Sequence, residues 1–219
     1  VDRRQRQMCI RDRIKTDYGI DFTSIRSASN LIKQHLDIFA NKEKGLLYKN
    51  ATEKRTPQEI IDYYKAVIEI VEKVNASHKR DQVVNLIKQD YGLDLSNITQ
   101  ASQLSKDQLD IFADPAKGLV YETANQKREP QVLVSYYEAV IDFVEGINNL
   151  LQQDPLKKAE LIALIKTDYG IDFTSIRSAS NLTKQHLDIF ANKEKGLLYK
   201  NATEKRTCLL YTSDAADDL

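Results

Sequence analysis

A pair of aspartates around Tyr-Gly is the most regularly repeated chemical feature of this chain. The pattern Asp-Tyr-Gly-x-Asp occurs three times, at Asp17/Asp21, Asp90/Asp94 and Asp168/Asp172. Two such carboxylates could bind calcium or act as an acid–base pair. The segment lacks the alternating oxygen ligands of a calcium loop, however, and the second aspartate is well placed to cap the next turn. We therefore interpret the second aspartate as a capping residue.

The histidines are the next candidates for chemistry. His35 and His186 each lie two residues before an aspartate, where an imidazole could act as a general base. The corresponding residue between them in the chain is Gln108, so the same segment forms without an imidazole. This favours a surface or helix-packing role for both histidines. His78 lies alone in a predicted joint between helices, and we assign no chemistry to it.

Basic residues recur before one predicted helix and could contact phosphate or an acidic polymer. They are Lys54-Arg55, Lys127-Arg128 and Lys205-Arg206, with Lys44, Lys117 and Lys195 nearby. Glutamates are interleaved with them, at positions 43, 53, 129 and 194. This mixture of charges favours a solvated surface over a binding edge.

Two tyrosine pairs, Tyr63-Tyr64 and Tyr136-Tyr137, could present rings for stacking on sugars or on partner side chains. Core packing of one ring with partial cover of the other is the simpler interpretation. The chain has no glycine-rich phosphate loop, no zinc-ligand spacing and no nucleophile elbow. We therefore predict no catalytic, cofactor-binding or metal-binding residues, no cofactor and no enzymatic activity.

The composition excludes several other classes of protein. The 219 residues include 32 Lys and Arg against 32 Asp and Glu, which gives no net charge, and 42% are hydrophobic. A neutral chain is not expected to bind nucleic acid through bulk charge. No run of 18 apolar residues is present, so no membrane insertion is predicted. A protein or a cell-surface polymer remains the expected kind of partner, and the oligomeric state is left open.

The two ends of the chain carry strings that we interpret as non-native. Cys208–Asp218 reads CLLYTSDAADD, the translation of a DNA string that resembles a transposase adapter used in preparing sequencing libraries. The complementary strand translates as RRQRQMCIRD, and Arg3–Arg13 reads RRQRQMCIRDR. We therefore expect residues 1–13 and 208–219 to be adapter-derived flanks. The alternative is a native basic arm and acidic tail.

The core between the flanks, residues 14–207, contains no Cys or Met, because Cys9, Cys208 and Met8 all lie in the flanks. A cysteine-free core excludes a disulfide, a thiolate zinc site and a cysteine nucleophile there. The missing methionine leads us to expect an internal fragment of a longer protein.

The core is a tandem repeat with a period of about 75 residues. IKTDYGIDFTSIRSASN at residue 14 recurs as IKQDYGLDLSNITQASQ at 87 and unchanged at 165. The first and third copies are identical over residues 14–56 and 165–207 except at Ile32 and Thr183. They are either genuine repeats or an assembly artefact.

Each copy is predicted to form three helical elements. Asp154 and Pro155 start the first element of the third copy, and a glycine ends the element in every copy (Gly19, Gly92 and Gly170). Ser105 and Thr183 can cap the second element, whereas Ile32 lacks the oxygen to do so and is expected to weaken it by about 1 kcal/mol. A turn follows, marked by Asp114-Pro115 and by Gly45, Gly118 or Gly196. The third element begins with the capping box Thr56-Pro57-Gln58-Glu59 and continues as a largely buried helix. Strands are not expected.

The predicted fold class is therefore all-α, with tandem three-helix modules of about 75 residues. The expected boundaries are 14–79 for repeat 1, which lacks its first helix, 80–153 for the complete repeat 2, and 154–207 for repeat 3, which lacks its third helix. The modules could be separate beads or a continuous stack with shared cores. The extra residues at Gln152–Lys158 favour beads, because a shared interface would tolerate an insertion poorly.

A neutral, cysteine-free helical repeat containing Lys and Asn is similar in composition to modules of long surface proteins of Gram-positive bacteria, although no motif identifies a family. The resemblance implies a non-enzymatic spacer or binding module and favours an extracellular or cell-surface location. The alternative is an intracellular helical scaffold that binds protein or peptide partners. An enzyme would require the Asp-Tyr-Gly segment to meet His35 or His186 in a concave site.

Overall fold

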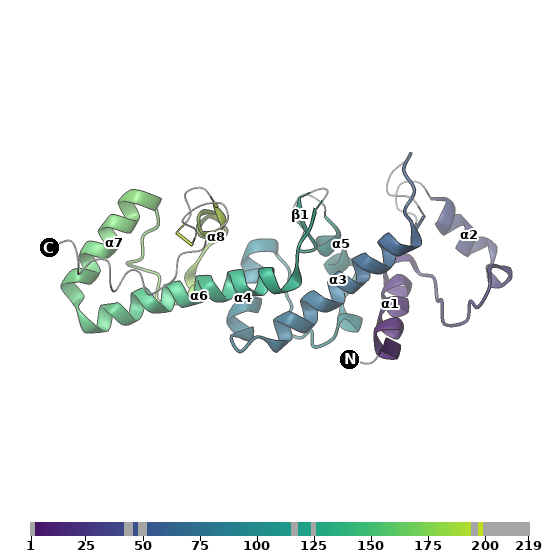
Figure 1. The fold of residues 1–219 in the computed structure, drawn as a ribbon, viewed down its shortest axis with the longest axis horizontal. Coiled ribbons are helices and arrows are strands. Elements are labelled where there is room, and N and C mark those ends of the chain that lie inside the picture. The colour runs from purple at the N-terminus through teal and green to yellow at the C-terminus, as the bar shows by residue number, and fades with distance from the viewer. Residues whose placement is uncertain are drawn as a thin grey trace. The chain divides into compact units, whose positions relative to one another are not determined.

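The computed structural model describes residues 3–41, 46–47, 52–114, 118–123, 126–193 and 197–198. The described chain is mostly helical, which confirms the all-α prediction (Figure 1). The α-helices are α1 Arg3–Tyr18, α2 Lys33–Ala40, α3 Pro57–Ala76, α4 Arg80–Tyr91, α5 Lys106–Ala113, α6 Pro130–Gln153, α7 Pro155–Tyr169 and α8 Lys184–Ala191. Three short 3-10 helices precede α2, α5 and α8: η1 Ala28–Asn30, η2 Ala101–Gln103 and η3 Ala179–Asn181. Within these residues, no helix is long and apolar enough to cross a membrane.

The expectation that strands would be missing is corrected by one small sheet. β1 Tyr121–Thr123 and β2 Gln126–Lys127 pair in antiparallel fashion. The backbone N–H of Arg128 extends the pairing by donating to the carbonyl of Val120 at 2.8 Å. Leu119 and Val120, just before β1, are fully buried, so the hairpin is anchored by its apolar start although it is too short for an alternating pattern.

Helix starts and stops lie where capping chemistry predicts them. Asp154 accepts hydrogen bonds from the backbone N–H groups of Leu156 and Lys157, and Pro155 is the first residue of α7. Gly19, Gly92 and Gly170 have φ angles of 75°, 71° and 76°. This left-handed conformation strains any residue with a Cβ, which explains why glycine ends the first element of every copy.

The capping boxes of the second and third elements are also confirmed. Ser105 Oγ accepts from the backbone N–H of Gln108, whose side chain accepts from Ser105 N at 2.9 Å. Thr56 Oγ1 accepts from the N–H of Glu59, and Glu59 Oε2 accepts from Thr56 N at 2.7 Å. Ile32, at the start of α2, makes no side-chain cap.

The third elements, α3 and α6, contribute more buried apolar residues than the other helices, as their broad apolar faces predicted. The buried residues of α3 are Tyr64, Val67, Ile68, Ile70, Val71 and Val74. Those of α6 include Leu133, Val134, Tyr137, Val140, Ile141 and Val144. Both helices begin at a proline, whose missing N–H costs nothing in the first turn.

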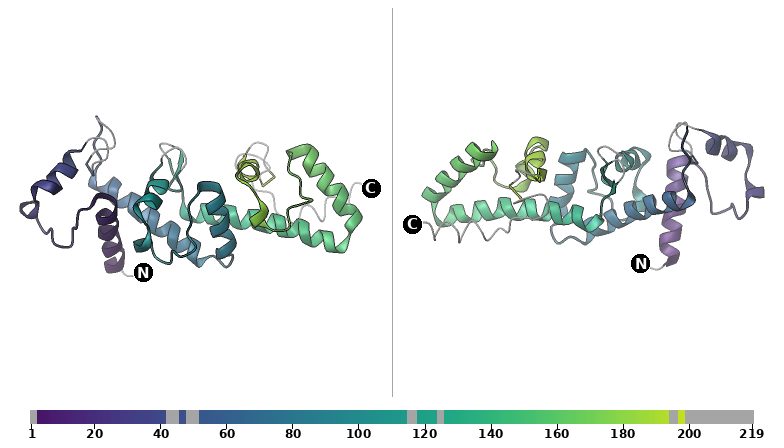
Figure 2. Two further views of the ribbon diagram at one scale, coloured as in Figure 1. Left: turned by 180° about the vertical axis from the view of Figure 1, so that it is seen from behind. Right: turned by 45° about the horizontal axis from the view of Figure 1, so that its top comes forward.

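The compact units of the structure do not coincide with the sequence repeats. One unit comprises residues 1–76 and 97–131, and the other comprises residues 77–96 and 132–219. In the first unit, α1 and α3 of the first copy pack with η2, and α1 also contacts α5; η2 and α5 belong to the second copy. In the second unit, α4 of the second copy contacts η3 and α8 of the third (Figure 2).

In each unit, the first and third elements of one copy therefore pack with the second element of the next. An isolated copy would leave its own helix pair without this cover. The physical reason is that the apolar faces of η2–α5 and η3–α8 are buried on the preceding copy. The insertion at Gln152–Lys158 lies at the joint of α6 and α7, outside these contacts, which explains why it does not interrupt them.

Helix α1 occupies the position of the first element of repeat 1, although residues 3–13 belong to the flank interpreted as adapter-derived. Arg13, in the position that Leu86 fills one repeat later, is 2% exposed. Its guanidinium donates to the carbonyls of Leu104 at 2.8 Å and Ser102 at 2.6 Å, while its buried Nε has no partner. Burial lowers the pKa of this group. Cys9 also lies in α1, as a free thiol, so the description "cysteine-free" applies only to residues 14–207.

Candidate functional site

The first aspartate of each Asp-Tyr-Gly pattern lies at the end of a first-element helix, and in two copies it is the centre of a polar cluster. In the first unit, Tyr64 of α3 donates its hydroxyl to Asp17 Oδ2 at 2.6 Å. Lys106 of α5 places its Nζ 2.8 Å from Asp17 Oδ1. Both oxygens of the carboxylate are thus engaged, one from the same copy and one from the next. We call Asp17, Tyr64 and Lys106 the first junction.

The second unit repeats this cluster with the corresponding residues. Tyr137 of α6 donates to Asp90 Oδ2 at 2.7 Å, and Lys184 of α8 lies 2.6 Å from Asp90 Oδ1. We call Asp90, Tyr137 and Lys184 the second junction. Its geometry matches that of the first although Lys106 and Lys184 lie in segments of different sequence. The recurrence shows that the arrangement follows from the repeat pattern.

The environment of each junction changes the proton affinity of its members. Burial, assisted by the negative charge of Asp17, raises the pKa of Tyr64 far above its usual value. Burial and the charge of Asp90 raise the pKa of Tyr137 in the same way. Both hydroxyls therefore remain protonated donors at neutral pH.

The lysines of the junctions are held between two carboxylates. Lys106 bonds to Asp110, one helical turn away in α5, as well as to Asp17. Although burial lowers the pKa of Lys106, the bonds to Asp110 and Asp17 raise it overall. Lys184 lies between Asp188 and Asp90, which raise its pKa in the same manner against the effect of burial. These lysines are charged and engaged, unlike a lysine prepared to act as a nucleophile.

Further contacts between consecutive copies surround each junction. Tyr63 and Tyr136, the neighbours of the junction tyrosines, donate to the carbonyls of Leu109 and Leu187 at 3.2 and 2.9 Å. At the other end of the third elements, Asn75 Nδ2 donates to Thr99 O at 3.1 Å, and Asn148 Nδ2 donates to Arg177 O at 2.9 Å. Each third element is thus fixed to the following copy at both ends.

The second aspartate of each pattern has the capping role that the sequence predicted. Oδ1 of Asp21, Asp94 and Asp172 accepts the backbone N–H two residues later, at 2.9, 3.0 and 3.0 Å. Oδ2 of each pairs with a lysine of the preceding helix at 2.6 Å. These bonds to the lysine and to the hydroxyl and N–H of the turn lower the pKa of all three carboxyls. The two aspartates of a pattern therefore have separate partners.

The histidines serve the helix starts. His186 Nδ1 accepts the backbone N–H of Thr183 at 3.1 Å, and Thr183 Oγ1 accepts the N–H of His186 at 3.4 Å. In α2, His35 Nδ1 accepts the backbone N–H of Ile32 at 3.4 Å. The element that carries His186 does pack on α4, but the contact to Asp90 is made by Lys184.

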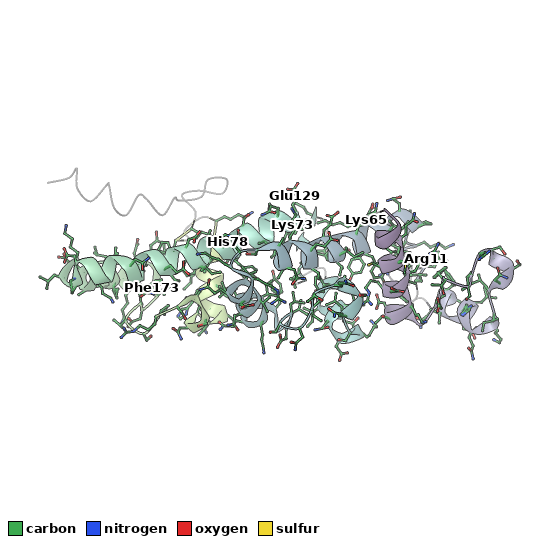
Figure 3. The ribbon with its side chains drawn as sticks, turned by 90° about the horizontal axis from the view of Figure 1, so that it is seen from below. Arg11, Lys65, Lys73, His78, Glu129 and Phe173 are labelled. Atoms are coloured by element: carbon green, nitrogen blue, oxygen red, sulfur yellow. The ribbon has the colours of Figure 1, made fainter. Side chains whose placement is uncertain are left out.

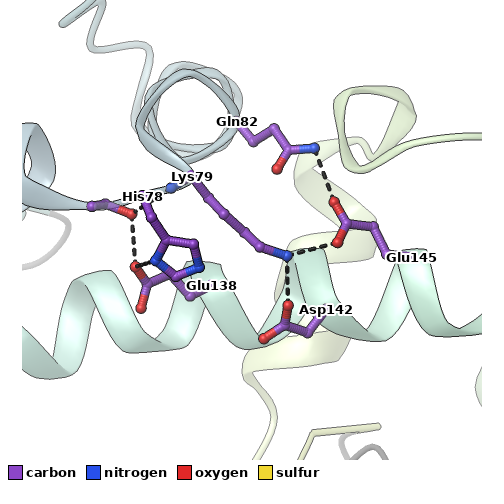
Figure 4. Close-up of polar contacts among 7 residues, drawn as sticks. His78, Lys79, Gln82, Glu138, Asp142 and Glu145 are labelled. Carbon is purple, nitrogen blue, oxygen red and sulfur yellow. Dashed lines mark hydrogen bonds and ion pairs between the residues drawn. The ribbon is translucent and has the colours of Figure 1, made fainter.

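His78 lies beside a separate polar cluster of the second unit, at the start of α4 (Figure 4). Lys79 Nζ lies 2.6 Å from both Asp142 Oδ1 and Glu145 Oε2 of α6, and Gln82 also bonds to Glu145. His78 Nδ1 is 3.7 Å from Glu138, which also accepts from the hydroxyl of Ser77. This cluster ties the first element of the second copy to the third element of the same copy.

The tyrosine pairs and the basic residues also have structural partners. Tyr64 and Tyr137 are core residues and Tyr63 is partly covered, as the sequence predicted, whereas Tyr136 is buried and not merely partly covered. Arg55 donates to the hydroxyl of Tyr18 at 2.7 Å. Arg128 also donates to the carbonyl of Tyr121, so the arginines of the predicted basic edge bond to the protein itself.

Several residues singled out in the sequence lie outside the described part of the chain. They are Glu43, Lys44, Gly45, Pro115, Lys117, Glu194, Lys195, Gly196, Lys205, Arg206 and the flank 208–219. Among the residues that are described, no group of three or more His, Cys, Asp or Glu side chains could hold a metal ion.

Comparison with models of known families, with curated proteins and with solved structures finds no match for this chain. The candidate site is therefore defined by its geometry. The junctions were not predicted from the sequence, because their lysines lie 89 and 94 residues from their aspartates. One signal was present: the Asp of Asp-Tyr-Gly and the second Tyr of Tyr-Tyr recur with the same spacing in both copies.

Proposed function

We propose that this chain is a non-enzymatic array of three-helix repeats in which each repeat is fastened to the next, and that it serves as a spacer or binding module. The repetition of the junction is the observation that carries the proposal. Asp17 and Asp90 are the strongest candidates for a chemical role. In each, one carboxylate oxygen accepts a tyrosine hydroxyl and the other pairs with a lysine. A general base or a metal ligand needs a free lone pair directed at its substrate or ion. Here one carboxylate oxygen is bonded within its own copy and the other is bonded to the next copy.

The same geometry favours a load-bearing or distance-setting role. In a repeat array, stability is the sum of intrinsic repeat terms and interface terms between neighbours. Ion pairs and hydrogen bonds that link consecutive copies add to the interface terms, so they make the array unfold in larger cooperative units. A spacer between a surface and a binding domain benefits from this property. The compositional similarity to surface-protein modules points the same way and favours an extracellular or cell-surface location.

Small-angle scattering and binding on a pair of chains test this proposal. The first chain is the present one, and the second contains one additional copy of residues 80–153 inserted after position 153. A spacer array predicts that the maximum dimension increases with the added copy and that the chain remains monomeric. Binding to bacterial cell-wall fragments should tighten with copy number if the modules bind a surface polymer. An unchanged maximum dimension would contradict the spacer proposal.

The alternative is an intracellular scaffold that binds protein or peptide partners in grooves between helices. It predicts binding of a soluble amphipathic peptide with no gain for cell-wall fragments in the longer chain. Either outcome leaves the interlocked repeat architecture in place, since that part of the proposal depends on the scattering measurement.

A further inference from the structure

The second element of the first copy exposes an apolar face that is buried in the two other copies. In the third copy this face consists of Phe173, Ile176, Ala179, Leu182, Leu187 and Phe190, all at most 2% exposed. The second copy buries the corresponding residues Leu95, Ile98, Ala101, Leu104, Leu109 and Phe112. In the first copy the same positions are Phe22, Ile25, Ala28, Leu31, Leu36 and Phe39, and each is half-buried or exposed. We call these six residues of the first copy the docking face.

The residues of the face itself do not cause this difference in exposure. Residues 14–56 and 165–207 are identical except at Ile32 and Thr183, and α2 and α8 have the same eight residues, KQHLDIFA. Nevertheless Leu36 is 52% exposed, whereas its counterpart Leu187 is 1% exposed. An identical helix with a buried face shows what the exposed face is shaped to contact. In the third copy that partner is the pair of helices α4 and α6 of the preceding copy.

The aromatic contacts indicate which kind of helix would cover the docking face. Phe143 of α6 contacts both Phe173 and Phe190, with ring centroids 6.0 and 5.5 Å apart. Phe173 is labelled in Figure 3. In the first copy, the corresponding rings of Phe22 and Phe39 contact each other directly, at 6.4 Å. The contact between Phe22 and Phe39 takes the place of the contacts that Phe143 makes with Phe173 and Phe190. The docking face is thus partly closed on itself.

The charges are complementary in the same way. Lys184 of α8 pairs with Asp188 and with Asp90 of the preceding copy, both at 2.6 Å. Lys33, its counterpart in α2, pairs with Asp37 at 3.5 Å and has an 88% exposed side chain. A preceding copy would offer Lys33 an aspartate of the Asp-Tyr-Gly pattern.

We infer that the docking face, residues 22–39, binds the first and third helices of another repeat of this type, supplied by a second copy of this chain. The inference rests on the repeat architecture proposed above. The second molecule would contribute its helices α4 and α6. Its Asp90 would pair with Lys33, and its Phe143 would insert between Phe22 and Phe39. In the wild-type chain α8 of the same molecule holds that surface. An intermolecular contact therefore forms when α8 is weakened.

The test uses the full chain with one substitution in α8. Leu187→Asp places a charge at a residue of α8 that is 1% exposed, and it leaves the α4–α6 surface free for the docking face of another molecule. Sedimentation velocity should show a monomeric wild-type chain and concentration-dependent association of the variant, tighter than any self-association of the wild type by at least about tenfold. Leu187→Ala should have the same effect in weaker form, and it serves as the second variant if Leu187→Asp does not fold.

The matched control is the same substitution in the docking face. Leu36→Asp alone should leave the chain monomeric, and the double variant Leu36→Asp/Leu187→Asp should lose the association. Mixing this double variant with wild-type chain should produce a one-to-one complex. The double variant then supplies the free α4–α6 surface, and the wild-type chain supplies the docking face. The inference is overturned if the Leu187 variants keep their helical circular dichroism but stay monomeric, or if the double variant associates as strongly as the single one. Neither result depends on the scattering experiment, so failure here is distinguishable from failure of the spacer proposal.

Discussion

The hydroxyl of Tyr137 offers the most direct measurement of what a junction contributes. Tyr137 is fully buried, and its hydroxyl donates to the largely buried carboxylate of Asp90 at 2.7 Å. A hydrogen bond to a charged group contributes about 1.5–3 kcal/mol. Tyr137→Phe removes this bond and leaves the ring in place, so we expect the free energy of unfolding to fall by about 2 kcal/mol.

The assay is urea unfolding followed by circular dichroism, analysed with one transition for each compact unit because two-state behaviour is not guaranteed for two units. Tyr169→Phe is the matched control: Tyr169 follows the Asp-Tyr-Gly aspartate of the third copy, and among the described residues its hydroxyl makes no hydrogen bond. This control should change the free energy of unfolding by less than about 0.5 kcal/mol.

A double-mutant cycle separates the junction from general packing. Asp90→Ala removes the acceptor, and once it is gone Tyr137→Phe should cost much less, which gives a coupling energy of about 1–2 kcal/mol. If Tyr137→Phe is as harmless as the control, or if the two substitutions are additive, the hydrogen bond between Tyr137 and Asp90 does not stabilise the protein. The role assigned to the junction is then wrong.

Three further predictions concern the first copy and the pH dependence. Ile32→Thr should restore the cap of α2 and stabilise its start by about 1 kcal/mol, seen as roughly fivefold slower amide hydrogen exchange in α2; unchanged exchange would contradict it. Arg13→Leu replaces a buried charge whose Nε has no partner, so the free energy of unfolding of the first unit should rise by about 1 kcal/mol despite two lost hydrogen bonds, and a decrease in the urea midpoint would refute this. Stability should fall above about pH 10, because the unfolded chain releases the protons of Tyr64 and Tyr137 while burial raises their pKa in the folded state. Urea midpoints between pH 7 and 11 measure that decline, which phenylalanine at both positions should make shallower.

The local structure of the chain could be predicted because its signals lie within a few residues of one another. Asp154 and Pro155 specify a helix start through bonds that span three residues, and Gly92 specifies a stop through its own backbone conformation. The turn formed by Asp94 likewise involves only the next two residues. Capping chemistry of this kind needs no knowledge of the fold.

The grouping of the elements could not be predicted in the same way. A repeat of three helices is compatible with a core inside each copy or with a core shared by consecutive copies, because both satisfy the same apolar periodicity. The choice depends on contacts such as Lys184 with Asp90, which are 94 residues apart. The role of the first aspartate was missed for the same reason: its partners become visible only when the next copy is in place.

The junctions explain why a charged group recurs at a largely buried position of the repeat. A purely apolar interface would let a second element dock on any helix pair with a similar surface, whereas a carboxylate left without its tyrosine or lysine is costly to bury. Asp17 and Asp90 therefore favour one register of docking over its alternatives. A repeat that requires a specific partner residue at each end is suited to extension by further copies of itself, and this requirement links the junctions to the docking face of the first copy.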